Sequence, residues 1–214
     1  MSAFIFKNMT RQGLEELFGL TRVREHPLLQ EWILAPQTLS ELELTVLRNL
    51  QDTLLDRIED WNEQELIMKF IGPMITLINF DTEYFSSFAE RPLSAHIGED
   101  DLSGIVDMMI ASGKQIPKAP YFCLHEYKKE QGTNNDPAGQ ALAAMLAAQT
   151  LNQQSFPIYG AYVLGRNWFF MILQGTEYSI SNEYAATKDE LFDIAGILKA
   201  LKQRLVEHSP GHAS

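Results

Sequence analysis

The sequence predicts a single-domain α/β fold in which helices pack on a sheet. Three observations favour this class. Apolar residues recur at helical spacing between about residues 38 and 78, the pattern changes to that of strands from about residue 92, and a further helix begins at Asp136 and Pro137. A chain of 214 residues with 45% hydrophobic residues can build one sizeable core, whereas two separate domains would each be small.

The first part of the chain reads as helical. Residues 10–20 form a short amphipathic segment, and two longer helices follow, separated at residues 60–62. Ser40 and Glu43 have the spacing of a capping box, in which each side chain bonds the backbone N–H of the other residue. The second long helix begins near Asn62, and Pro73 should kink or end it because proline lacks a backbone N–H.

The middle and the end of the chain alternate between strands and helices. Residues 92–111 read as two strands joined by a polar turn, and residues 121–128 read as a third strand. Asp136 at the N-cap and Pro137 at the first helical position then open a helix with an alanine-rich centre. Further strands follow in residues 158–186, with a hairpin turn at residues 165–167, and a last helix spans residues 188–208. We therefore expect a helical addition in residues 1–61, a core in 62–175, and a strand and a helix in 176–214.

Composition restricts the class of protein. The net charge of -11 argues against a general grip on nucleic acid through a basic surface, although it leaves room for a local basic or metal-filled cleft. The single cysteine, Cys123, cannot form an internal disulfide, so a reducing compartment such as the cytoplasm is expected. No signal peptide and no run of 18 apolar residues is present, so we expect neither export nor a membrane span.

An acid and a base stand two residues apart in the third predicted strand. Side chains alternate between the faces of a strand, so Glu126 and Lys128 share one face with Phe122 and Leu124, and His125 lies on the other face. On the preceding strand, Asp107 shares a face with Ile105 and Met109. If the two strands lie side by side, Asp107, Glu126 and Lys128 can meet.

These three residue types suit a metal site that acts on phosphate. Two carboxylates and a backbone carbonyl offer the oxygen ligands that Mg²⁺ or Mn²⁺ prefers. Such an ion polarises a phosphate and lowers the pKa of a bound water. A neighbouring lysine can hold the attacking water or stabilise the charge that develops on the phosphate.

The motifs GIVD at 104–107 and EYK at 126–128 carry a resemblance to a known family. Glu126 follows Asp107 by 19 residues, and the predicted order is helix, three strands, helix, strand. This combination resembles the PD-(D/E)xK nuclease superfamily, whose core is restriction-endonuclease-like. The resemblance implies a Mg²⁺- or Mn²⁺-dependent nuclease that hydrolyses phosphodiester bonds, in DNA rather than RNA. It also implies that Asp107 and Glu126 bind the metal and that Lys128 assists catalysis.

Two further positions come from the same resemblance. Many members carry a glutamate on the helix before the first core strand, in a stretch similar to ELIMKFIGPMI, which maps to Glu65 with Glu63 as second choice. Some members place a glutamine in the helix after the lysine strand, where this chain has Gln140. The chain departs from the family at Val106, which replaces the proline of the motif, and at Ala144, where some members have tyrosine.

Plainer interpretations stand beside the catalytic one. Asp107 could simply end a hairpin strand, and Glu126 with Lys128 could form an exposed cross-strand ion pair. His125 and Cys123 read as packing residues rather than as a metal ligand and a nucleophile. An alternative function is a non-catalytic protein of the same fold with an assembly or regulatory role, which the acidic charge favours. Such a protein would act with a basic protein partner. A homodimer also stays open, and so does a hydrolase of a smaller phosphorylated substrate.

Overall fold

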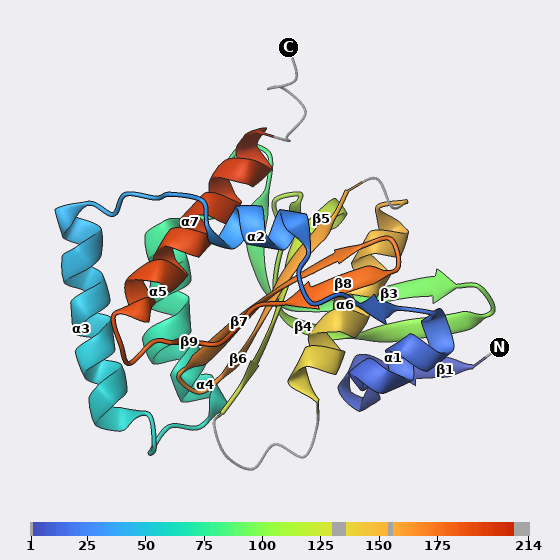
Figure 1. Cartoon of the computed structure of the whole chain (residues 1–214), viewed down its shortest axis with the longest axis horizontal. Coiled ribbons are helices and arrows are strands. Elements are labelled where there is room, and N and C mark those ends of the chain that lie inside the picture. The colour runs from blue at the N-terminus through green and yellow to red at the C-terminus, as the bar shows by residue number, and fades with distance from the viewer. Residues whose placement is uncertain (1, 130–135, 154–155, 208–214) are drawn as a thin grey trace.

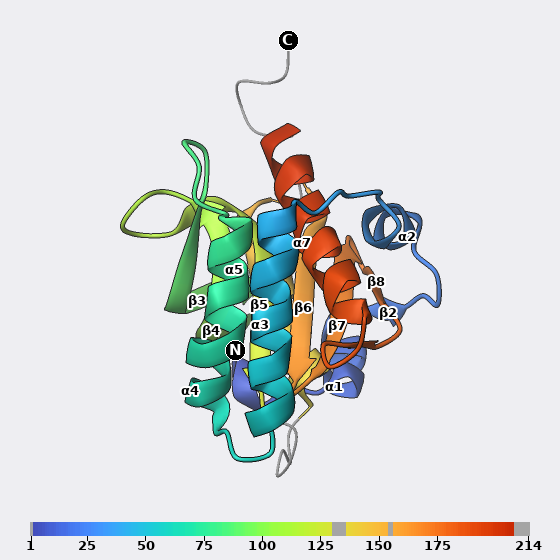
Figure 2. The same cartoon turned by 90° about the vertical axis from the view of Figure 1, so that its left-hand side faces the viewer.

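A computed structural model of the chain describes residues 2–129, 136–153 and 156–207. Within these residues nine strands form one sheet, with a layer of helices on one face and a long helix with a short one on the other (Figures 1 and 2). The mixed α/β class predicted from the sequence is therefore confirmed. None of the helices in the described ranges combines the length and the apolar character that a membrane crossing requires.

The helical layer contains most of the predicted helices. It comprises α2 (Pro27–Ile33), α3 (Glu41–Arg57), α4 (Glu63–Leu66), a π-helical turn (Ile67–Ile71), α5 (Gly72–Ile78) and α7 (Glu190–Glu207). The capping box at Ser40 is confirmed, because Ser40 and Glu43 each bond the backbone N–H of the other residue. Pro73 does not end its helix. It follows the π-helical turn at once, and the helix continues to Ile78.

The opposite face of the sheet is covered by α1 (Arg11–Phe18) and α6 (Pro137–Leu151), which follows Asp136 as predicted. Six alanines among its 15 residues let α6 lie close to the strands, and nearly all of its residues are buried. Asp136 does not cap its own helix with its side chain. Its carboxylate accepts instead from the backbone N–H and the Nε–H of Arg11, both at 2.9 Å.

The long strands are β3 (Ser86–Ile97), β4 (Asp100–Ser112), β5 (Lys118–Lys128), β6 (Ile158–Leu164), β7 (Asn167–Gln174) and β8 (Glu177–Ile180). The order across the sheet is β1-β4-β5-β6-β7-β8-β2, with β3 beside β4 and β9 (Tyr184–Ala185) beside β7. β4 runs antiparallel to β5, whereas β5 runs parallel to β6. A parallel pair needs a crossover connection, and α6 supplies it.

The N-terminal part is not only helical, which corrects the expected division of the chain. β1 (Ala3–Ile5) precedes a short 3-10 turn (Phe6–Asn8) and pairs with β4, while β2 (Thr21–Arg22) pairs with β8. Strands of two or three residues are too short to show an alternating pattern, so periodicity could not find them. For a similar reason the predicted strand after residue 176 divides into β8 and β9.

A β-bulge in β5 also corrects the expected faces. Ile110 pairs with Cys123 while Ala111 pairs with Tyr121, so Phe122 is the extra residue of β5. Phe122 packs in the same apolar cluster as Tyr127, under the helical layer. Phe122 therefore does not share a face with Glu126 as predicted, because the bulge changes the alternation of side chains between the two residues.

Candidate functional site

The three predicted core residues meet where β4 and β5 lie side by side. Met108 pairs with His125, so Asp107 stands opposite Glu126 in this antiparallel pair. The backbone N–H of Tyr127 donates to Asp107 Oδ2 at 2.7 Å. Lys128 Nζ lies 2.8 Å from Glu126 Oε1 and 3.8 Å from Asp107 Oδ2. Two acids and a lysine, distant in the sequence, thus form one group.

A third carboxylate, that of Glu63, completes what we call the acid cluster: Asp107, Glu126, Lys128 and Glu63. Glu63 Oε1 lies 3.5 Å from Lys128 Nζ. Glu63 is the first residue of α4, which lies beside the carboxyl end of β5 (Figure 1). The cluster therefore joins one end of the sheet to the helical layer.

Glu65, the preferred candidate on this helix, is engaged elsewhere. Its carboxylate accepts from the backbone N–H of Asn62 at 3.1 Å and from Lys69 Nζ at 2.8 Å. Asn62 in turn accepts from the backbone N–H of Glu65, which makes a capping box at the start of α4. The geometry therefore supports Glu63, the second choice, rather than Glu65.

The backbone around Asp107 explains why its side chain can turn toward this end of the sheet. Val106 and Met108 would point to the same face in a regular strand, yet Val106 packs on the α6 side and Met108 under the helical layer. β4 thus rotates about its axis at Asp107. Facing it on β3, Glu90 has a φ of 49°, in the left-handed region, which marks a local interruption of that strand.

Glu90 also lies near the acid cluster, although no sequence pattern singles it out. It lies on β3, which begins at Ser86, six residues before the predicted start of the strand region at 92. Its carboxylate accepts from Gln64 Nε2 at 3.2 Å, and its negative charge contributes to the raised pKa of Asp107. No motif marks this glutamate, and only the pairing of β3 with β4 brings it near the acid cluster.

Burial dominates the electrostatics of the acid cluster. Glu126 is 8% exposed, and burial raises its pKa to about 7, with a further rise from Asp107 and an opposing effect of Lys128. Burial likewise raises the pKa of Asp107, against the hydrogen bond from Tyr127. For Lys128, burial alone would lower the pKa, but Glu126, Asp107 and Glu63 together outweigh it and raise the pKa. One ammonium group thus serves three carboxylates, and the cluster keeps a surplus of negative charge.

This surplus and the donor set fit a hard divalent cation. Among the residues that the structure describes, no group of three or more His, Cys, Asp or Glu side chains is arranged to hold a metal. In the acid cluster the ammonium of Lys128 is the close partner of Glu126. Carboxylate oxygens from Asp107 and Glu126, with Glu63 nearby, are nevertheless the ligand type that Mg²⁺ and Mn²⁺ take. The chemistry of the residues fits the ion that the sequence predicts.

Gln140 lies on α6, which packs against β5. Its side chain is 4% exposed, and its Nε2 makes no hydrogen bond to any described residue. No described hydrogen bond joins Gln140 to the acid cluster, so its part in the site stays a prediction.

His125, His96 and two of the aromatic residues after residue 167 lie outside the acid cluster. His125 is buried under the helical layer, where Nδ1 lies 2.8 Å from Tyr127 Oη, and burial lowers its pKa to about 3. His96 is exposed beside Asp101, at the hairpin between β3 and β4. Of the aromatic run after residue 167, Trp168 and Phe170 belong to the core under the helical layer. The side chain of Cys123 lies outside the described part of the structure.

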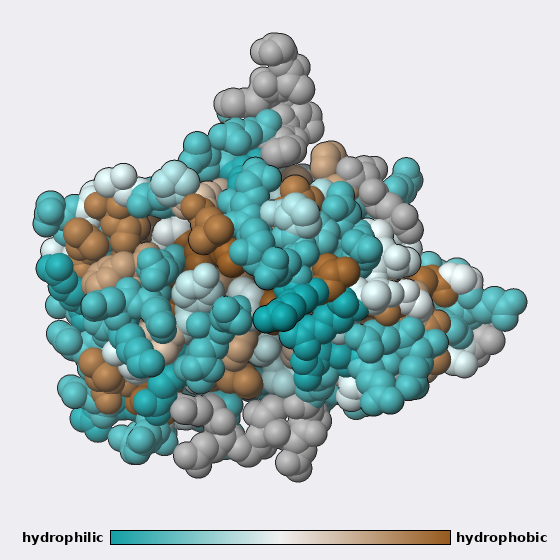
Figure 3. All heavy atoms as spheres, in the orientation of Figure 1, coloured by the Kyte–Doolittle hydropathy of each residue, from teal (hydrophilic) through white to brown (hydrophobic). Residues whose placement is uncertain are grey.

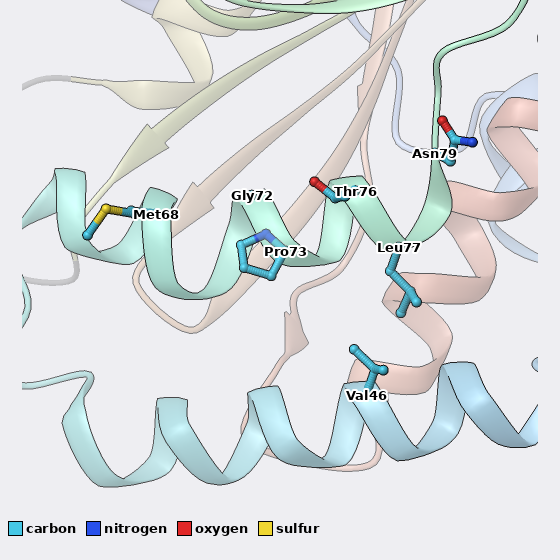
Figure 4. A pocket seen from close by; sticks show the side chains of 7 residues that line it. All are labelled: Val46, Met68, Gly72, Pro73, Thr76, Leu77 and Asn79. Carbon is cyan, nitrogen blue, oxygen red and sulfur yellow. The ribbon is translucent and has the colours of Figure 1, made fainter.

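A hollow of about 780 Å³ between α3 and α5 is chemically different from the acid cluster. Figure 3 shows apolar patches over the helical side of the molecule, on a face that is otherwise mostly polar. No member of the acid cluster and no titratable side chain lines the hollow. The lining consists of Val46, Met68, Gly72, Pro73, Thr76, Leu77 and Asn79 (Figure 4).

Comparison with known proteins adds no family. No protein-family model matches the chain, and no curated protein has a matching sequence. The functional interpretation therefore rests on the geometry of the site.

Proposed function

We propose that the chain is a metal-dependent nuclease of the PD-(D/E)xK kind that hydrolyses phosphodiester bonds in DNA. The observation that carries the proposal is the convergence of Asp107, Glu126 and Lys128 from two neighbouring strands. The element order around them agrees with a restriction-endonuclease-like core: a helical segment in α4 and α5, then β3, β4 and β5, then α6, then β6. The single cysteine is consistent with work in a reducing compartment such as the cytoplasm.

In this proposal Asp107 and Glu126 hold a Mg²⁺ or Mn²⁺ ion. When bound, such an ion polarises the phosphate and lowers the pKa of a water. The hydrogen bond from Tyr127 N–H to Oδ2 holds the carboxylate of Asp107 in place beside Lys128. Lys128 Nζ donates to an oxygen of the phosphate as its negative charge grows. Glu63 keeps Lys128 protonated and oriented while this happens.

A non-catalytic assembly or regulatory role on the same fold is the second candidate. Lys128 is already engaged by three carboxylates and by the carbonyl oxygen of Tyr127 at 2.9 Å, an arrangement that a purely structural ion-pair network would also have. The net charge of -11 favours a basic protein partner for such a role. A homodimer would serve either function, because enzymes that cut both strands commonly act as symmetric dimers.

A cleavage assay decides between these candidates. Purified protein is incubated with labelled single- and double-stranded DNA and RNA in Mg²⁺, in Mn²⁺ or in a chelator. We expect metal-dependent cleavage of DNA that is lost in Asp107→Asn and in Lys128→Ala. The matched control Lys188→Ala changes an exposed lysine outside the cluster and should cleave normally. Cleavage that is unchanged in Lys128→Ala would remove the catalytic role of that lysine, and a wild type that cleaves no substrate would favour the non-catalytic candidate.

A further inference from the structure

A second hollow, of about 440 Å³, lies at the N-terminus of α6, on the face of the sheet that carries Glu126 of the acid cluster. Tyr162 connects the two places. It is the β6 partner of Glu126 in the parallel pair of β5 and β6, so both side chains share one face of the sheet on strands about 5 Å apart. The lining consists of Thr10, Arg11, Asp136, Pro137, Ala138, Tyr162 and Leu164.

Tyr162 offers a hydroxyl group to this hollow. The residue is 9% exposed, and its ring stacks on that of Phe169 with centroids 4.6 Å apart and planes inclined by 6°. Its hydroxyl makes no hydrogen bond to any described residue. Because Tyr162 lines the hollow, its hydroxyl can form a hydrogen bond with a molecule that binds there.

Arg11 presents unused donors to the same hollow. Its Nε–H and backbone N–H bind the carboxylate of Asp136, which fixes one edge of the guanidinium. The two terminal NH₂ groups donate to no described residue, and these form part of the fork that recognises phosphate. Burial raises the pKa of Tyr162, the positive charges of Arg11 and Arg22 oppose that rise, and the negative charge of Asp136 adds to it. Two arginines therefore lie close enough to act on the tyrosine hydroxyl.

The N-terminus of α6 adds to this positive character. Asp136 stands at the N-cap but directs its carboxylate to Arg11, so its side chain does not cap the first backbone N–H groups of the helix. Uncapped N–H groups at the start of a 15-residue helix attract anions. Ala138, in this first turn, lines the hollow. The negative charge of Asp136 is already offset by its ion pair with Arg11.

We infer that this hollow is a phosphate-binding subsite, which holds a phosphate of the nucleic-acid strand next to the phosphate at the acid cluster. The inference rests on the proposed function, because the subsite is defined as the position next to a phosphate that binds at the acid cluster. Although the chain has a net charge of -11, Arg11 and the N-terminus of α6 give this hollow hydrogen-bond donors for a phosphate. The phosphate is either a diester within the strand or a terminal monoester.

Binding of a short fluorescent single-stranded oligodeoxynucleotide, followed by anisotropy with Ca²⁺ in place of Mg²⁺, tests the subsite apart from cleavage. Tyr162→Phe removes only the hydroxyl, and we expect it to weaken binding about fivefold, the effect of one hydrogen bond. Arg11→Gln should weaken binding about tenfold, because a charge-assisted bond is stronger. The matched controls Tyr121→Phe, at the other end of β5, and Arg57→Gln, on α3, should bind as the wild type does.

Two competitors identify the source of the phosphate. Displacement by a dinucleoside monophosphate without terminal phosphates indicates a diester, and displacement by inorganic phosphate alone indicates a terminal monoester. Wild-type affinity in both Tyr162→Phe and Arg11→Gln would overturn the subsite, as would a wild type that binds no oligonucleotide. Cleavage that depends on Asp107 but not on Tyr162 or Arg11 would leave the proposed function standing without the subsite. Tyr162-dependent binding without cleavage would leave the subsite standing without the nuclease.

Discussion

Glu126 and His125 are adjacent on β5, but their side chains lie on opposite faces of the sheet and have different surroundings. Both side chains are buried, and burial favours the uncharged form of each, so it raises the pKa of Glu126 to about 7 and lowers that of His125 to about 3. On the side of His125 there are aromatic rings, including those of Tyr127 and Trp168. On the side of Glu126 there are Asp107, Lys128 and Glu63.

The comparison shows that a strongly shifted pKa does not by itself identify a site. The shift of His125 has burial as its cause, which is what a histidine in a packed core experiences. The shift of Glu126 arises from burial together with the charges of three other groups that converge on it. Convergence of several titratable groups, rather than the size of one shift, is what distinguishes a candidate site.

The largest expected difference between the two residues is in catalysis. Glu126→Gln keeps the size of the side chain but removes the carboxylate, and we expect metal-dependent cleavage to fall about a thousandfold. His125→Phe should keep cleavage near the wild-type rate, because the imidazole lies on the other face of the sheet. Rates measured on the same labelled DNA check both variants, with circular dichroism as the control for folding. An equal loss of cleavage rate in the two variants would contradict the assignment of Glu126, and not His125, to the site.

The contributions of Glu126 and His125 to the stability of the folded protein should also depend on pH in opposite directions. The folded protein favours protonated Glu126, so the stability it contributes is complete below pH 4.5 and is lost as pH rises toward about 7. The folded protein favours neutral His125, so that contribution is present above pH 6.5 and is lost as pH falls toward about 3. Each slope amounts to at most about 1.4 kcal/mol per pH unit.

Urea unfolding across this pH range separates the two slopes. Relative to the wild type, Glu126→Gln should gain stability as pH rises from 4.5 to about 7. His125→Phe should gain stability relative to the wild type as pH falls below 6.5. If the free energy of unfolding of a variant changes with pH as that of the wild type does, the corresponding pKa shift is absent from the folded protein.

Lys128 should compete with a divalent cation for the carboxylates. Lys128→Met removes the ammonium that lies 2.8 Å from Glu126, and we expect it to tighten Mn²⁺ binding about tenfold at alkaline pH while abolishing cleavage. Lys69→Met is the matched control, since Lys69 has an equally short contact, 2.8 Å, with Glu65 outside the cluster. Titration calorimetry measures both affinities. Weaker Mn²⁺ binding in Lys128→Met would show that the lysine supports the ion instead of competing with it.

The smallest expected effect distinguishes the two glutamates of α4. Glu63→Ala removes a carboxylate 3.5 Å from Lys128 Nζ, and we expect cleavage to fall about fivefold because Lys128 loses one of its orienting partners. Glu65→Ala should leave the cleavage rate unchanged, because Glu65 serves the capping box and Lys69. A larger loss in Glu65→Ala than in Glu63→Ala would restore the original preference.

Local rules predicted much of this fold and site. The capping box at Ser40 and the helix start at Asp136 and Pro137 depend on a few adjacent residues, and both were found where the sequence indicated. The juxtaposition of Asp107, Glu126 and Lys128 followed from strand alternation and the pairing of two successive strands. The capping role of Glu65 could also have been predicted, because Asn62 and Glu65 have the same capping-box spacing as Ser40 and Glu43.

Other features depend on contacts between distant parts of the chain. The bulge at Phe122 depends on how β4 pairs with β5, and no residue type in the sequence predicts it. The ion pair between Arg11 and Asp136 joins positions 125 residues apart, so neither the missing cap of α6 nor the second hollow could be read from the sequence. Glu90 approaches Asp107 only because β3 is longer than its apolar pattern suggests.

Titration calorimetry with Mn²⁺ tests the central claim most directly, because it requires no assumption about the substrate. The wild type, Asp107→Ala and the exposed control Asp52→Ala are titrated under the same conditions, with and without a short oligonucleotide. The account predicts that the wild type and Asp52→Ala bind the ion and that Asp107→Ala does not. Undiminished binding in Asp107→Ala, or no binding to the wild type even with the oligonucleotide present, would contradict the assignment of the acid cluster as a metal site.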